Sequence, residues 1–181
     1  ASRGGLKLFY AIEKYQVQLS DKVVLDIGAS TGGFTDVCLQ QGARHVYAVD
    51  VGVDQLVQSL KDNPKVSNFE NCDIRTLDPA KIEQVIDFIC IDVSFISLKK
   101  IFDVVAAYCN DKTELLVLVK PQFEVGKNFV NKQGVVKDKN VHKRLLQDYM
   151  DYFQSLGFGI KAIDKAAIQG RSGNQEYIFY M

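Results

Sequence analysis

The sequence predicts an α/β fold built on a doubly wound, mostly parallel β-sheet. Short apolar runs typical of strands alternate along the chain with segments of helical periodicity. The first strong run, residues 22–27, is almost wholly apolar around Asp26, as expected of a strand buried on both faces. A glycine-rich turn follows it and leads directly into a predicted helix. In parallel sheets, this arrangement forms a ligand-binding crevice.

The individual elements follow from the same patterns. The first helix spans residues 6–15, because Leu6, Phe9 and Tyr10 recur roughly on one face. Strands are predicted near 22–27, 45–50, 65–69, 85–92, 114–120, 158–167 and 175–181, and further helices near 33–41, 52–61, 78–83, 97–108 and 138–156. Only a turn separates the last two strands, so they pair as a hairpin and the last strand runs antiparallel. Residues 1–181 are predicted to form a single domain.

Composition narrows the functional class only slightly. The chain has 22 Lys plus Arg and 22 Asp plus Glu, so its net charge neither favours nor excludes a nucleic-acid partner. Its four cysteines show no C-x-x-C spacing, so we expect no metal site and a reduced, cytoplasmic setting. No apolar run approaches the ~20 residues of a membrane span, and we expect no membrane partner.

Three interpretations compete for the glycine turn at residues 28–33. Gly28, Ser30 and Gly32 match the G-x-S-x-G elbow of hydrolases, but the available histidines, His45 and His142, are poorly placed for a triad. The dinucleotide pattern G-x-G-x-x-G fails because Ser30 replaces its second glycine. S-adenosylmethionine has a carboxylate, a ribose and an adenine but no phosphate, and it suits this turn best.

The cofactor interpretation predicts a set of binding residues along the first four strands. Asp50 closes the second strand, where it can hydrogen-bond ribose hydroxyls. Asp73 and Ile74 follow the third strand and are expected beside the adenine. The full predicted set is Asp26, Gly28, Ala29, Ser30, Gly32, Gly33, Phe34, Asp50, Val51, Asp73, Ile74 and Asp92.

Two further strands also end on charged residues. Asp92 closes the fourth strand and Lys120 closes the fifth, and both should meet Asp26 and Asp50 at one edge of the sheet. A single charged strand end is commonly just solvated. Four of them at the same edge indicate a functional site.

Five segments of the chain resemble the TlyA group, whose members are FtsJ-like ribose 2′-O-methyltransferases of ribosomal RNA, often named hemolysins. The segments are Ser2-Arg3-Gly4-Gly5-Leu6-Lys7-Leu8, residues 26–36, Ile91-Asp92-Val93-Ser94-Phe95, Val119-Lys120-Pro121-Gln122-Phe123-Glu124 and Gly173-Asn174-Gln175-Glu176-Tyr177. The resemblance implies a Rossmann-like class I methyltransferase sheet, S-adenosyl-L-methionine as cofactor, and ribosomal RNA or ribosomal subunits as partner. It also implies that the catalytic residues are Lys7, Asp92, Lys120 and Glu176.

The sequence departs from the resembled family at two places. Family members carry an RNA-binding domain before the first motif, whereas this sequence starts at that motif, so we expect the catalytic domain without the upstream domain. The wider FtsJ pattern has a proline where Thr31 stands, which should not impair cofactor binding.

The implied chemistry requires a base, because a ribose hydroxyl is a very weak acid. Lys120 is the natural base if it is neutral when it acts. Burial and the nearby cation of Lys7 favour the neutral amine, whereas Asp92 and Glu176 favour the charged one. The sequence leaves this balance open.

Other classes of methyltransferase fit less well. The loop after the fourth strand reads Asp92-Val93-Ser94-Phe95 and lacks the Asp/Asn-Pro-Pro-aromatic motif of amino-methylating enzymes. Cys90 lies inside the strand pattern, which argues against a cysteine nucleophile and favours hydroxyl methylation.

A basic segment supports an RNA substrate. Residues 120–145 contain seven Lys or Arg against two acidic residues, with Phe123 and Phe129 among them, as expected of an edge that contacts phosphates. Two alternatives remain open: a non-catalytic assembly factor that binds S-adenosylmethionine and RNA, and a membrane-active hemolysin.

Overall fold

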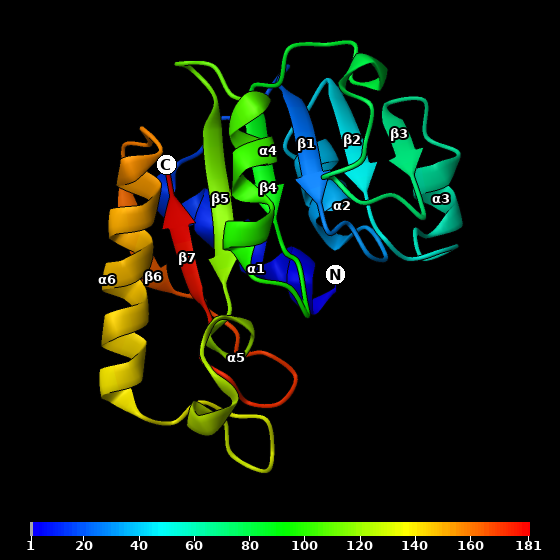
Figure 1. Cartoon of the computed structure of the whole chain (residues 1–181). Coiled ribbons are helices and arrows are strands. Elements are labelled where there is room, and N and C mark those ends of the chain that lie inside the picture. The colour runs from blue at the N-terminus through cyan, green and yellow to red at the C-terminus, as the bar shows by residue number, and fades with distance from the viewer. Residues whose placement is uncertain (1) are drawn as a thin grey trace.

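The protein folds around a seven-stranded sheet with the order β3-β2-β1-β4-β5-β7-β6, in a computed structural model that describes residues 2–181 (Figure 1). The strands are β1 Val23–Ile27, β2 His45–Val49, β3 Val66–Phe69, β4 Phe88–Ile91, β5 Glu114–Val119, β6 Ala162–Lys165 and β7 Tyr177–Tyr180. The α-helices are α1 Arg3–Tyr15, α2 Gly33–Gln40, α3 Gln58–Lys61, α4 Phe102–Ala107, α5 Pro121–Glu124 and α6 Lys139–Ser155. Strands β1 to β5 are parallel, and the predicted doubly wound sheet is confirmed.

Alternate residues of the central strands β1, β4 and β5 enter two separate cores, one on each face of the sheet. On one face, Leu25 of β1 packs with side chains of α4 and α6, including Phe102 and Phe153. On the other face, Val24 packs with side chains of α1 and α2, including Leu8 and Val37. Figure 1 shows α4 in front of the sheet and α1 and α2 behind it. Both faces are therefore covered, which explains why the strand sequences are nearly continuous apolar runs.

The antiparallel end of the sheet is also confirmed. Strand β7 lies between β5 and β6 and runs antiparallel to both, with Val119 opposite Tyr177 at the end nearest the site. This pairing brings the residues before β7 to the carboxyl end of β5. Lys120 and Glu176, which follow β5 and precede β7, are thereby brought to one edge of the sheet.

Three of the predicted helices are wrong in extent. The helix expected near 52–61 is reduced to α3, because backbone groups of this segment bond elsewhere: Val57 N donates to Thr31 O at 3.1 Å, and Gly52 O accepts from Asn71 N at 2.8 Å. The helix expected near 78–83 is only the 3₁₀ turn η1 Pro79–Lys81. The helix expected over 97–108 is divided into η2 Leu98–Lys100 and α4, and the short helix α5 was not predicted.

Candidate active site

The site lies where the chain order of the sheet reverses, at the carboxyl ends of β1 and β4. Crossovers from these neighbouring strands leave on opposite faces, which opens a crevice between them. A cavity of about 740 Å³ occupies this place. Its lining includes the turn residues Gly28, Ala29, Ser30, Thr31, Gly33 and Phe34, together with Lys7, Asp92, Lys120 and Glu176.

Gly28 is required by the close approach of β1 and β4. Its φ of +83° lies in the left-handed region, and a Cβ there would stand 2.2 Å from the backbone oxygen of Asp92. The glycine thus lets the turn after β1 touch the loop after β4. As a result, the predicted cofactor turn and the predicted catalytic Asp92 belong to one site.

Helix α1 brings Lys7 into the cavity. Ser2 caps the helix by accepting a hydrogen bond from Gly5 N at 3.0 Å, so the helix begins at Arg3, earlier than predicted. A Cβ on Gly5 would lie 3.0 Å from Gly33 O, which shows how closely α1 packs against the turn. The Lys7 side chain is therefore buried, with the residue only 7% exposed.

Lys7 forms an ion pair with Glu176, with 2.7 Å between Nζ and Oε1. Glu176 is 2% exposed, so this pair is almost fully withdrawn from water. Such a pair persists only when both charges have close partners. The second carboxylate oxygen of Glu176 accepts a hydrogen bond from Gln122 Nε2 at 3.3 Å.

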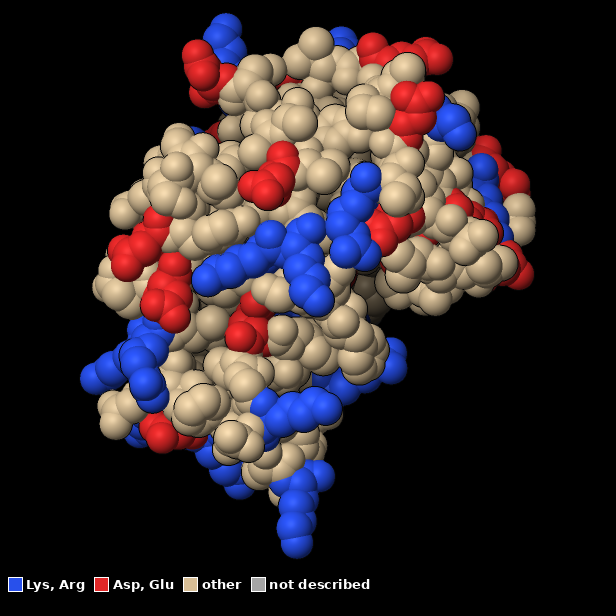
Figure 2. Space-filling model, in the orientation of Figure 1, with Lys and Arg blue, Asp and Glu red and all other residues tan. Residues whose placement is uncertain are grey.

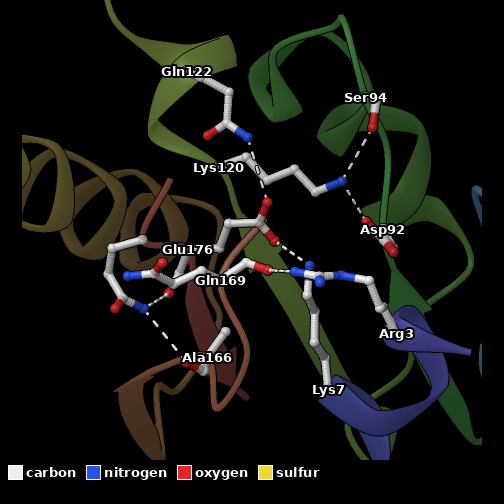
Figure 3. A network of polar contacts seen from close by, with 10 residues as sticks. Arg3, Lys7, Asp92, Ser94, Lys120, Gln122, Ala166, Gln169 and Glu176 are labelled. Atoms are coloured by element: carbon white, nitrogen blue, oxygen red, sulfur yellow. Dashed lines mark hydrogen bonds and ion pairs between the residues drawn. The ribbon is translucent and has the colours of Figure 1, made fainter. Parts of the chain in front are cut away.

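Lys120 forms the second charged pair of the site. Its Nζ lies 2.5 Å from Asp92 Oδ1 and donates a hydrogen bond to Ser94 Oγ at 3.1 Å. Lys120 is 8% exposed. Figure 3 shows Lys7 rising from α1 toward Glu176, while the Lys120 side chain reaches across to Asp92 and Ser94. The four predicted catalytic residues thus come together from four separate segments.

Ser94 and Gln122 were not predicted as site residues. Both belong to segments that carry the resemblance, two residues after Asp92 and Lys120 respectively. That spacing from a charged strand end was the available signal.

Asp50 lies beside the glycine turn as predicted. Its Oδ2 accepts a hydrogen bond from Ser30 N at 2.7 Å, and its Oδ1 accepts one from Gly52 N at 2.7 Å. These bonds fix the carboxylate while leaving each oxygen a free lone pair.

Asp26 lies beneath the turn and does not line the cavity. Its side chain is fully buried, and Oδ2 accepts a hydrogen bond from Thr35 Oγ1 at 2.7 Å, while Oδ1 has no partner in the described part of the chain. Burial, with a smaller contribution from the charges of Asp92 and Asp50, raises the pKa of Asp26 to about 7. Asp26 therefore contacts the start of α2 through Thr35 and does not face the cavity.

The residues expected near the adenine lie away from the cavity. Asp73 pairs with the Arg75 side chain at 2.7 Å, and Ile74 is buried in the core with 4% exposure. Val51 is exposed. None of these three lines the cavity, and neither does Asp50.

The hydrolase interpretation finds no support in the site. Across residues 2–181, no histidine lines the cavity. His45 hydrogen-bonds Ser67, and His142 bonds Tyr177 and Val136. Neither histidine is therefore placed to act as a base for Ser30.

Aromatic and basic side chains surround the mouth of the cavity. Phe95 is 90% exposed, and its ring centroid lies 5.0 Å from that of Phe123. Both rings line the cavity. Figure 2 shows Lys and Arg side chains gathered over the lower part of this face, where Figure 1 places α5, the segment after it and the turn before β7. The exposed basic residues of these segments are Lys127, Lys132, Lys137 and Arg171.

No helix within residues 2–181 combines the length and the apolar character needed to cross a membrane.

Comparison with known proteins agrees with this geometry. "Putative rRNA methyltransferase YqxC" of Bacillus subtilis is 40% identical over 181 residues, which cover 99% of this chain and 64% of the relative. "16S/23S rRNA (cytidine-2'-O)-methyltransferase TlyA" of Mycobacterium tuberculosis is 39% identical over 180 residues, covering 99% of this chain and 67% of the relative. The chain thus spans about two thirds of the length of these relatives.

The solved structure "Putative hemolysin from Streptococcus thermophilus" superposes with a TM-score of 0.95 and 41% identity, covering 99% of this chain and 66% of that one. The family model for FtsJ-like methyltransferases matches residues 1–181. The chain therefore belongs to the FtsJ-like methyltransferase family.

Proposed function

We propose that this chain transfers a methyl group from S-adenosylmethionine to a ribose 2′-hydroxyl of ribosomal RNA. The observation that carries the proposal is the meeting of Lys7, Asp92, Lys120 and Glu176 in two close ion pairs at one cavity. The same cavity is lined by the glycine turn, so a methyl donor and an acceptor hydroxyl can lie side by side in it.

The chemistry of the turn fits S-adenosylmethionine better than a phosphorylated cofactor. Residues 26–43 contain no Lys or Arg to neutralise a phosphate. The fixed carboxylate of Asp50 has lone pairs available for ribose hydroxyls, and the first backbone N–H groups of α2 suit a carboxylate. When bound, S-adenosylmethionine supplies an electrophilic methyl group on a sulfonium sulfur.

Lys120 serves as the base in this proposal. In its neutral form, Nζ would take the proton of the acceptor hydroxyl, and the hydroxyl oxygen would form its new bond to the methyl carbon as the carbon–sulfur bond of the donor breaks. Asp92 and Ser94 hold the amine in place at 2.5 and 3.1 Å. The second pair, Lys7 and Glu176, lies on the α1 side of the same cavity and orients the hydroxyl.

RNA is the acceptor that the mouth of the cavity fits best. The exposed Phe95 ring, next to Phe123, offers a face on which a nucleobase can stack. The basic segment supplies cations for the phosphate backbone. The relatives above are named for methylation of ribosomal RNA, and we place the reaction on ribosomal subunits in the cytoplasm.

Methyl transfer tests the proposal directly. Ribosomal subunits from cells lacking the gene are incubated with the protein and S-adenosylmethionine carrying a labelled methyl group, and the label is then mapped on the RNA. We expect incorporation at a ribose 2′-oxygen that the Lys120→Ala variant does not produce. Binding of cofactor and RNA without incorporation would contradict the proposal and favour an assembly factor. Leakage of dye from liposomes, without methylation, would favour a membrane-active protein.

A further inference from the structure

Glu124 is a carboxylate that the proposed reaction does not use, yet three neutral donors hold it. Ser97 Oγ donates to Oε2 at 2.7 Å, Tyr149 OH donates to the same oxygen at 2.5 Å, and Leu98 N donates to Oε1 at 2.9 Å. None of the ion pairs in residues 2–181 involves Glu124. The carboxylate therefore acts through hydrogen bonds and not through pairing with a cation.

These bonds join two segments that meet again at the catalytic lysine. Glu124 is the last residue of α5, which begins directly after Lys120. Ser97 and Leu98 follow the loop of residues 93–96, which carries Ser94. Because Lys120 Nζ bonds Ser94 Oγ, the two segments are tied at one end by the lysine and at the other by Glu124.

The loop between these ties needs such support. Phe95 has a φ of +63°, in the left-handed region that residues with a bulky side chain avoid. Its ring is 90% exposed, so burial contributes little to holding this conformation. The loop is fixed at its start by the bond from Asp92 N to Ile27 O at 3.0 Å, and at its end by Glu124.

We propose that Glu124 is a positioning residue, which holds the end of the 93–96 loop so that Asp92 and Ser94 stay in contact with Lys120 Nζ. This inference rests on the proposed function, because it assigns Glu124 a part in methyl transfer. The structural part of the inference, that Glu124 fixes the 93–96 loop, can be measured without any substrate.

Two variants separate hydrogen bonding from charge. Glu124→Ala removes all three bonds. Glu124→Gln can restore them, because its amide oxygen accepts from Leu98 N while its NH₂ group donates to the hydroxyls of Ser97 and Tyr149, which accept as well as donate. In single-turnover methylation of ribosomal subunits with saturating cofactor, we expect Glu124→Ala to be about 10–100-fold slower, the effect of a misplaced reactive group. We expect Glu124→Gln to be close to wild type, and cofactor affinity to be unchanged in both.

A fluorescent reporter follows the loop itself. The chain contains no tryptophan, so Phe95→Trp introduces a single one in the exposed part of the loop. We expect Glu124→Ala to lower the anisotropy of this tryptophan and Glu124→Gln to leave it unchanged. Tyr149→Phe is the matched control, since it removes the bond to α6, together with the 3.4 Å contact between Tyr149 OH and Ser97 Oγ, but keeps both bonds from Glu124 to the loop. It should lower stability while changing neither anisotropy nor rate.

The outcomes distinguish this inference from the proposed function. Unchanged anisotropy in Glu124→Ala would overturn the inference, as would a Glu124→Gln variant as slow as Glu124→Ala. If the wild-type protein transfers no methyl group, the proposed function is wrong. The anisotropy measurement still tests whether Glu124 fixes the loop. If Glu124→Ala does not fold, Ser97→Ala replaces it in both measurements, with a smaller loss expected because one bond to the loop remains.

Discussion

The buried Asp26 makes the stability of the folded chain depend on pH. Its pKa is raised from 3.8 to about 7, chiefly by burial, so the folded chain binds this proton more tightly than the unfolded chain does. The resulting stabilisation is fully present below pH 4 and is lost as pH rises through 7. At about 1.4 kcal/mol per pKa unit, it amounts to about 4 kcal/mol, of which about 2.5 kcal/mol disappears between pH 5 and pH 8.

The variant Asp26→Asn removes this titration while keeping an oxygen that can accept from Thr35. Urea unfolding without cofactor, at pH 5 and pH 8, gives the free energy of unfolding of both proteins. We expect the wild type to lose about 2.5 kcal/mol more than the variant over this interval. Other titrating groups are common to both proteins and cancel in the comparison.

Asp36→Asn is the matched control. Asp36 is an exposed aspartate on α2 whose carboxylate accepts from the side chain of Gln40. Its pH dependence should run parallel to that of the wild type. If Asp26→Asn also runs parallel to the wild type, Asp26 is ionised throughout this range, and the reasoning from burial is wrong.

Three further predictions concern the site. Lys120→Ala should slow single-turnover methyl transfer by a factor of about 10²–10⁴ without weakening cofactor binding. Lys120→Arg should be nearly as slow, because a guanidinium keeps its proton. A near-normal rate for Lys120→Arg would mean that the lysine only supplies charge. Asp50→Ala should weaken cofactor binding, measured by calorimetry, by about 1.5–3 kcal/mol, the cost of losing charged hydrogen bonds. Asp73→Ala should weaken it less, because the Asp73 carboxylate is engaged by Arg75. Equal losses of affinity would indicate that Asp73 also contacts the cofactor. Gly28→Ala should lower the free energy of unfolding, measured by urea titration, by about 2–4 kcal/mol, because its Cβ clashes with the backbone of Asp92. Gly157 has a similar φ but open space around it, so Gly157→Ala should lower the free energy of unfolding by only about 1 kcal/mol.

The centre of the sheet could be predicted because strands β1, β4 and β5 are buried on both faces, so each of them appears as a nearly continuous apolar run. The charged strand ends, Asp92 and Lys120, could also be placed, since parallel strands bring their carboxyl ends to one edge. The first and last residues of the helices could be predicted less well from the sequence. Residues 52–57 have a helix-compatible composition, but their backbone groups bond to the glycine turn and to the segment after β3 instead.

The pairing inside the site is not encoded in local spacing. Lys7 and Glu176 are 169 residues apart, and by itself each resembles an ordinary exposed residue on a helix or a strand. Only the resemblance to a known family indicated them. For Asp73 the general pattern was informative but incomplete: an acid follows the third strand as expected, and Arg75, two residues on, engages its carboxylate.

The ion pair between Lys7 and Glu176 also determines the order in which the parts of the site can form during synthesis. Lys7 precedes its partner by 169 residues, so a growing chain holds the glycine turn and Asp50 before it can form this ion pair. Until Glu176 is present, burying Lys7 would remove an unpaired cation from water, which is unfavourable, so the start of α1 should not pack stably against the sheet. A protein truncated before residue 176 should therefore keep its parallel strands but leave α1 open to proteases, whereas a chain that includes Glu176 should protect it. The proposed catalytic centre can thus form only after Glu176 has been made.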